Sequence, residues 1–209
     1  MTWNQTLIDE LFPRGSAKKV TILRDPVTLL SSAWKYYYSV MYPRQAAKMS
    51  TADRVAHLNT LLQQPTAFYT EMMQTLNRRR HTLRSQLFSF HGPKVWERNL
   101  EKDKVREMIR EMDAEFDLVL IMEYFDLGLA LLSIELCWPL KYVSYLKMNA
   151  GMKAKVKKKN YHEELIRVIN YPDFMLYEHF NATFWKRIHA VGLVRVQNMA
   201  NEIQEYSSL

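Results

Sequence analysis

Two short apolar runs stand out against a chain that otherwise shows helical spacing of its hydrophobic positions. Val20–Leu23 is apolar and rich in β-branched residues, and Asp117–Met122 continues from its aspartate with apolar residues only, which predicts two buried strands. Asp25 and Pro26 follow the first run closely. Proline suits the first position of a helix and aspartate suits the N-cap before it, so we expect a helix to follow. Because residues 27–38 are apolar or aromatic on most faces, we expect this helix to be largely buried.

Apolar residues at three- and four-residue steps predict the remaining elements. These helices are expected over Asp53–Leu62, Thr66–Arg80, Glu101–Met112, Phe125–Leu136 and, as one long helix, Asp173 to about Glu205. Their inward faces are predicted to hold Val105, Met108, Ile109 and Met112 in the third, and Phe180, Phe184, Ile188 and Val191 in the last. Strands that alternate with helices favour an α/β fold with a parallel sheet and many added helices.

The amino-acid composition indicates a globular protein and excludes several kinds of site. The 209 residues, 48% hydrophobic and 24% charged, are typical of one globular domain. Only five glycines are present and no two are close together, which excludes glycine-rich dinucleotide and Walker A loops. The single cysteine, Cys137, excludes an internal disulfide, and we expect it to be a buried small residue or half of a disulfide with a partner outside this chain.

The net charge of +7 indicates an anionic partner such as nucleic acid, acidic lipid, or a ligand that carries phosphate or sulfate. Arg24 would lie at the carboxyl end of the first strand, where open α/β sheets bind ligands, and Ser32 would lie early in the next helix. A guanidinium can donate two hydrogen bonds to one phosphate and a hydroxyl can donate a third. The alternative is that Arg24 pairs with a nearby carboxylate and Ser32 is a small buried residue, and spacing alone favours this alternative.

A family resemblance reverses that preference. Residues 20–38 resemble the 3′-phosphate-binding segment of Golgi sulfotransferases, and more closely that of the galactose-3-O-sulfotransferase family. Residues 116–150, with gaps, and residues 176–185 match the same family in the same order. Three ordered matches, which together run with gaps from about residue 19 to 197, are far more specific than the spacing of an arginine and a serine.

The resemblance implies a P-loop-like α/β sulfotransferase core and 3′-phosphoadenosine 5′-phosphosulfate as the sulfuryl donor, with no metal. Arg24 and Ser32 map onto the residues that hold the 3′-phosphate, with Asp25 and Ser31 as neighbours. The acceptor implied is the 3-hydroxyl of galactose in a glycolipid of the galactosylceramide type or in a glycan. The family also implies the lumenal side of the Golgi membrane, where the sequon at Asn181 would be glycosylated.

One departure from the family concerns the loop rich in Lys, Thr and Ser that grips the 5′-phosphosulfate and supplies catalytic residues. Only 19 residues precede Val20, and none forms such a loop. We therefore expect residues 1–209 to be one partial catalytic domain without the N-terminal strand, that loop and the membrane anchor, and to be inactive alone. No catalytic residue is assigned.

Two rival functions remain open. One is a truncated, non-catalytic homologue or a basic module that binds anionic glycans. The other is a nucleic-acid-binding module that uses the basic runs at Arg78–His81 and Lys153–Lys159. We rank nucleic acid last and expect none as a partner, because no nucleic-acid motif or interleaved aromatic platform accompanies these runs.

Overall fold

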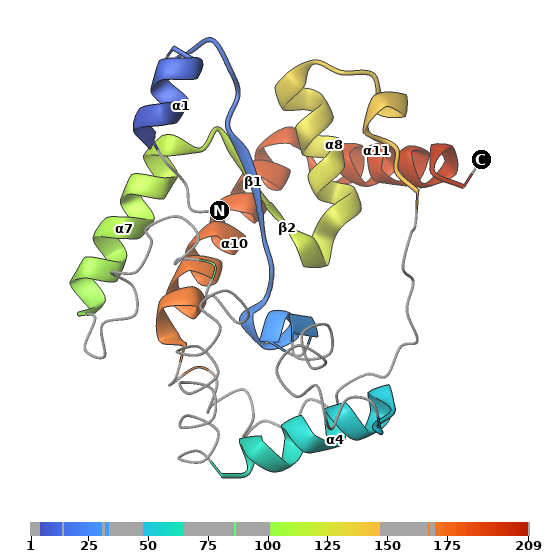
Figure 1. The fold of residues 1–209 in the computed structure, drawn as a ribbon. Coiled ribbons are helices and arrows are strands. Elements are labelled where there is room, and N and C mark those ends of the chain that lie inside the picture. The colour runs from blue at the N-terminus through green and yellow to red at the C-terminus, as the bar shows by residue number, and fades with distance from the viewer. Residues whose placement is uncertain are drawn as a thin grey trace. The chain divides into compact units, whose positions relative to one another are not determined.

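The computed structural model describes residues 5–13, 15–30, 32–33, 48–64, 86, 101–146, 167 and 170–208 (Figure 1). The chain forms two compact units. Unit 1 comprises Met1–Arg24, Gln86–Ala150 and Met175–Leu209, and unit 2 comprises Asp25–Ser85 and Gly151–Phe174. The predicted helix at Thr66–Arg80 and both basic runs lie outside the described residues.

A parallel pair of strands forms the centre of unit 1. β1 (Val20–Leu23) pairs with β2 (Leu118–Ile121) in a register that runs from Val20 opposite Leu118 to Leu23 opposite Ile121. All four residues of β2 are buried, whereas Leu23 is the fully buried member of β1 and Ile22 is 42% exposed. The predicted strands and their parallel arrangement are confirmed.

Two helices adjoin β2 in the chain and cover the strands. Figure 1 shows α7 (Lys102–Glu115) and α8 (Phe125–Leu136) on opposite sides of the strands. The inward face of α7 consists of the predicted residues Val105, Met108, Ile109 and Met112. Gly128 lets α8 approach β2 closely, since a Cβ atom added at Gly128 would lie 3.3 Å from Leu120 Cδ2. Both helices were expected from the spacing of apolar residues.

The long C-terminal helix is divided into two, so the expectation of one continuous helix is wrong. α10 (Tyr171–Val191) ends before Gly192, and α11 (Leu193–Tyr206) begins after it. Gly192 has φ +103°, a conformation that only glycine adopts without strain, and its N–H donates to Ile188 O at 3.0 Å. The predicted inward face is confirmed for Phe180, Phe184 and Ile188, which are buried. The turn allows α11 to pack against α8.

Short elements complete unit 1. They are α1 (Gln5–Leu11) and the 3₁₀ helices η2 (Met122–Tyr124) and η3 (Leu140–Val143). The ring of Tyr124 in η2 stacks on Phe184 at 6.0 Å and meets Trp185 edge-on at 4.9 Å, so η2 is fastened to α10. Of the helices in the described part of the chain, none has both the length and the apolar character needed to cross a membrane.

Cys137 lies at the C-cap of α8, and the expectation that it is buried is wrong. The residue is exposed and has φ +53°, in the left-handed region. Its N–H donates to Ile134 O at 3.2 Å, which closes the last turn of α8. Helices commonly end with a residue in this conformation. Cys137 is exposed because this end of α8 lies at the surface, where the next residue, Trp138, is also 50% exposed.

Unit 2 begins with the helix that was expected after Pro26. Residues 26–30 and 32–33 are helical, and the N–H of Thr28 donates to Asp25 Oδ1 at 2.8 Å, which confirms Asp25 as the N-cap. α4 (Thr51–Leu62) starts with a reciprocal cap. Ser50 N donates to Asp53 Oδ2 at 2.9 Å, and Asp53 N donates to Ser50 Oγ at 3.2 Å.

Candidate functional site

The carboxyl ends of β1 and β2 form one edge of the parallel pair. Leu23 is opposite Ile121, so Arg24 leaves β1 where Met122 and Glu123 leave β2. Ligands of open parallel sheets bind at this edge because the connections that follow the strands diverge there. The structure therefore places Arg24 at the edge where the sequence predicted it, and its role as an anion ligand stays a prediction.

Gln86 holds the backbone of Arg24 at two points. The N–H of Arg24 donates to Gln86 Oε1 at 2.7 Å, and Gln86 Nε2 donates to the carbonyl oxygen of Arg24, also at 2.7 Å. Both residues are half-buried members of unit 1. Sequence reasoning missed Gln86, because 62 positions separate it from Arg24 and no local pattern links them.

The other residues predicted to hold the 3′-phosphate belong to unit 2. Ser32 is helical and half-buried, and Ser31 lies outside the described residues. Asp25 has a structural role, because its carboxylate accepts the N–H of Thr28 at the start of the helix. The convergence of Arg24 and Ser32 on one anion stays a prediction.

Two carboxylates follow β2 at the same edge, and both have hydroxyl partners. Glu123 accepts a hydrogen bond from Tyr177 at 3.2 Å. Asp126, in the first turn of α8, accepts from the Tyr145 hydroxyl at 2.8 Å and from Gln204 Nε2 at 2.5 Å. Burial, and then the hydrogen bond to Asp126, raise the pKa of Tyr145 to about 12. Asp126 thus joins the start of α8 to the segment that follows η3 and to the last turn of α11, and sequence reasoning missed this link.

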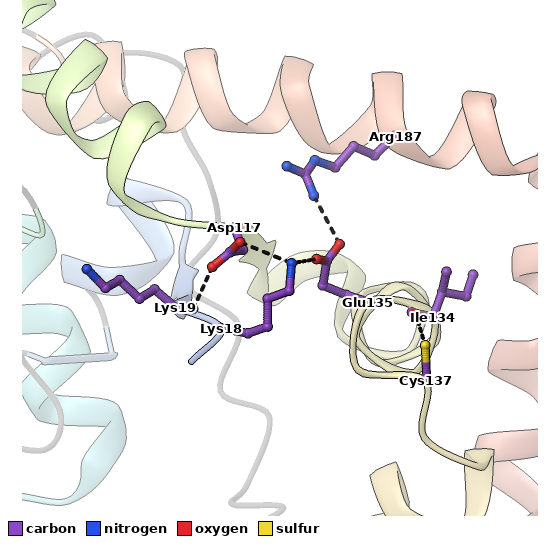
Figure 2. A network of polar contacts seen from close by, with 7 residues as sticks. All are labelled: Lys18, Lys19, Asp117, Ile134, Glu135, Cys137 and Arg187. Atoms are coloured by element: carbon purple, nitrogen blue, oxygen red, sulfur yellow. Dashed lines mark hydrogen bonds and ion pairs between the residues drawn. The ribbon is translucent and has the colours of Figure 1, made fainter. Parts of the chain in front are cut away.

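A different set of charges lies at the amino ends of the strands (Figure 2). Lys18 Nζ is 2.8 Å from Glu135 and 3.2 Å from Asp117, and Arg187 is 3.8 Å from Glu135. The N–H of Lys19 donates to Asp117 Oδ2 at 2.8 Å. This backbone hydrogen bond, and secondarily Lys18, lower the pKa of Asp117, while the bonds to Glu135 and Asp117 raise the pKa of Lys18. Each of these cations has a carboxylate close by, so the cluster joins β1, β2, α8 and α10.

Other singled-out residues lie on α10. His179 is 3.4 Å from Asp113 Oδ2 and meets Phe180 edge-on at 4.9 Å, a position within the packing of α7 and α10. Asn181 is half-buried in the same helix, and its glycosylation stays a prediction. Within the described ranges, no three His, Cys, Asp or Glu side chains gather as metal ligands would.

Comparison with known proteins gives the family. The model of the galactose-3-O-sulfotransferase family matches residues 1–208. Mouse galactosylceramide sulfotransferase is 36% identical over 197 residues, which cover 92% of this chain and 43% of the relative. Mouse galactose-3-O-sulfotransferase 3 is 34% identical over 191 residues, which cover 89% of this chain and 42% of the relative.

The human galactosylceramide sulfotransferase is also 36% identical, over 88% of this chain and 41% of its own length. The chain thus spans less than half the length of these relatives. No solved structure matches it. With a family match along almost its entire length, the chain belongs to the galactose-3-O-sulfotransferase family.

Proposed function

We propose that this chain takes part in the transfer of a sulfuryl group from 3′-phosphoadenosine 5′-phosphosulfate to the 3-hydroxyl of a galactose residue. Family membership supports the reaction class. The observation that carries the donor part is the position of Arg24 at the carboxyl edge of the parallel pair. The α/β arrangement of β1 and β2 with their helices agrees with a P-loop-like sulfotransferase core, which is part of the proposal.

Arg24 is suited to the 3′-phosphate of the donor. A planar guanidinium can donate two parallel hydrogen bonds to one phosphate group. Ser32 would donate a third bond from the helix that follows. The net charge of +7 supports attraction of a nucleotide that carries several negative charges.

The proposed reaction is an in-line displacement at sulfur. The oxygen of the galactose 3-hydroxyl forms a bond to sulfur while the bond from sulfur to the 5′-phosphate oxygen breaks. The leaving 3′-phosphoadenosine 5′-phosphate keeps the electron pair, and a base takes the hydroxyl proton. A residue that holds the far end of the nucleotide contributes by fixing the donor, so that its sulfur is aligned with the acceptor. We assign Arg24 this binding role and assign no base.

The acceptor in the proposal is a galactose of a glycolipid or of a glycan. Two of the relatives are named for galactosylceramide and another for galactose alone, at nearly equal identity. Galactosylceramide and lactose are therefore the two acceptors to compare. A Golgi-lumenal setting with Asn181 glycosylated completes the proposal.

The direct test is calorimetric binding of 3′-phosphoadenosine 5′-phosphate to the wild type and to Arg24→Ala. Loss of a charge-assisted bidentate contact should weaken binding by about 1.5–3 kcal/mol, or roughly 10- to 150-fold. Adenosine 5′-phosphate lacks the 3′-phosphate and should bind more weakly to the wild type. Arg24→Ala should leave the affinity for adenosine 5′-phosphate unchanged. Arg187→Ala is the matched control, because it removes the same side chain at the opposite edge of the strands. Equal affinity of the wild type and Arg24→Ala would refute the donor assignment.

A further inference from the structure

The side-chain amide of Gln86 makes the two backbone hydrogen bonds to Arg24 that a neighbouring strand would otherwise make. One amide accepts the N–H of Arg24 and donates to the carbonyl oxygen of the same residue, and both N···O distances are 2.7 Å. A neighbouring strand would pair both backbone groups of a residue in this way. The ladder between β1 and β2 ends at Leu23 and Ile121, so Gln86 extends the pairing one residue beyond the strand.

The chemistry of these two bonds depends on the residue type. Only Asn and Gln carry an acceptor oxygen and a donor NH₂ on one planar group, as the amide of the peptide backbone does. Glutamate would accept the N–H of Arg24, but its second oxygen would face the carbonyl oxygen with no proton between them. Alanine would leave both backbone groups of Arg24 without these partners.

The place of the pair in the chain adds a second reason. The chain leaves unit 1 after Arg24 and returns to it at Gln86. The two hydrogen bonds therefore join the ends of the segment 25–85 at the point where both ends meet unit 1. Because the backbone of Arg24 is held in one position before binding, less conformational entropy is lost when its side chain binds an anion than if this backbone were free to move.

We propose that Gln86 is a positioning residue of the donor site, which holds the backbone of Arg24 so that its guanidinium is aimed at the 3′-phosphate. This inference rests on the proposed function, because it acts through Arg24. Gln86 itself would not touch the nucleotide.

The test measures the affinity for 3′-phosphoadenosine 5′-phosphate of Gln86→Ala and Gln86→Glu, each relative to the wild type at the same pH. At pH 7.5 both variants should bind roughly 5- to 20-fold more weakly, as expected for the loss of one to two hydrogen bonds that preorganise a site. At about pH 5 the carboxyl group introduced by Gln86→Glu would be partly protonated, and its O–H would donate to the carbonyl oxygen of Arg24. Gln86→Glu should then recover to within about threefold of the wild type, while Gln86→Ala should not recover.

The pH comparison separates positioning from simple charge repulsion. If a negative charge near the phosphate were the sole cause, Gln86→Ala would bind as the wild type does, and that result would overturn the inference. If Gln86→Glu bound weakly because of a general loss of structure, its affinity would not recover on acidification, and that result would overturn the inference too. The melting temperature of each variant is measured first, and binding is then measured at a temperature below it.

A double-mutant cycle separates this inference from the proposed function. In an Arg24→Ala background, Gln86→Ala should weaken binding by less than about twofold, since the residue through which it acts is gone. Additive losses would show that Gln86 does not act through Arg24. If Arg24→Ala alone leaves affinity unchanged, the donor assignment fails. If Arg24→Ala weakens binding and Gln86→Ala does not, the inference fails and the donor assignment stands.

Discussion

Replacement of Tyr145 by phenylalanine tests the hydrogen bond that joins Tyr145 to Asp126 in the first turn of α8. The Tyr145 hydroxyl donates to Asp126 Oδ1 at 2.8 Å, and the Tyr145 ring meets Phe125 edge-on at 5.0 Å. Tyr145→Phe keeps the ring and removes the hydroxyl. Asp126 retains the hydrogen bond from Gln204, so the carboxylate is not left without a partner.

The expected loss at pH 7 is about 1.5 kcal/mol in the free energy of unfolding, the low end for a hydrogen bond to a charged group. In a chain of this size that loss lowers the melting temperature by roughly 3–6 °C. The low end applies because Gln204 continues to partner Asp126.

The pKa of Tyr145 adds a pH dependence with a definite sign. Burial and Asp126 raise this pKa from 10.0 to about 12, so folding favours the neutral phenol. The resulting stability is fully present below pH ~10 and is lost as the pH rises towards 12. A shift of this size should remove most of the wild-type advantage between pH 9 and pH 11, and Tyr145→Phe has no such group to titrate.

The assay is urea unfolding of the wild type and Tyr145→Phe at pH 7, 9 and 11. We expect a difference of about 1.5 kcal/mol at pH 7 and 9 that nearly disappears at pH 11. Tyr142→Phe is the control, since the Tyr142 side chain is 65% exposed and its loss should change stability by less than about 0.5 kcal/mol. A difference between wild type and Tyr145→Phe that stays the same from pH 7 to pH 11 would contradict this prediction.

Two more predictions concern the ends of α8 and β2. Cys137→Gly should raise the free energy of unfolding by about 0.5–1 kcal/mol, because glycine adopts φ +53° without the strain that a side chain brings; a lower melting temperature would contradict this. Asp117→Asn should lower it by about 0.5–1 kcal/mol at pH 7, since Asp117 accepts from Lys19 N and pairs with Lys18. The backbone hydrogen bond from Lys19 lowers the pKa of Asp117 in the folded state, so this difference should be present above pH ~4 and shrink as the pH falls below that, and a constant difference would count against it.

Much of the local structure could be predicted from the spacing of apolar residues. The bounds of α8 agree with those expected, the two strands pair in parallel, and all four inward residues of α7 are buried. These elements are predictable because a buried strand or a one-sided helix leaves its period in the sequence. The break at Gly192 was missed because the hydrophobic spacing continues through the turn and hides it.

The candidate site was predictable at one residue. Arg24 follows an apolar run, so its place at the end of a strand is a local property. Gln86 has no such signal, since its two bonds to Arg24 join positions 62 residues apart. The same holds for the Tyr145 bond to Asp126, which depends on how the segment after η3 returns to the first turn of α8.

Local patterns in the sequence were enough to predict both strands, α7, α8 and the position of Arg24 at a strand end, because each depends on residues that are close together along the chain. The family followed from three matches in the same order along the chain. Packing in three dimensions selects the partners that hold these residues. Gln86 reaches Arg24, and the Cys137 thiol lies in solvent, because of how separate elements pack and end. Hydrogen bonds between distant segments are selected by the geometry of the packed core, and that geometry has no period in the sequence from which it could be predicted.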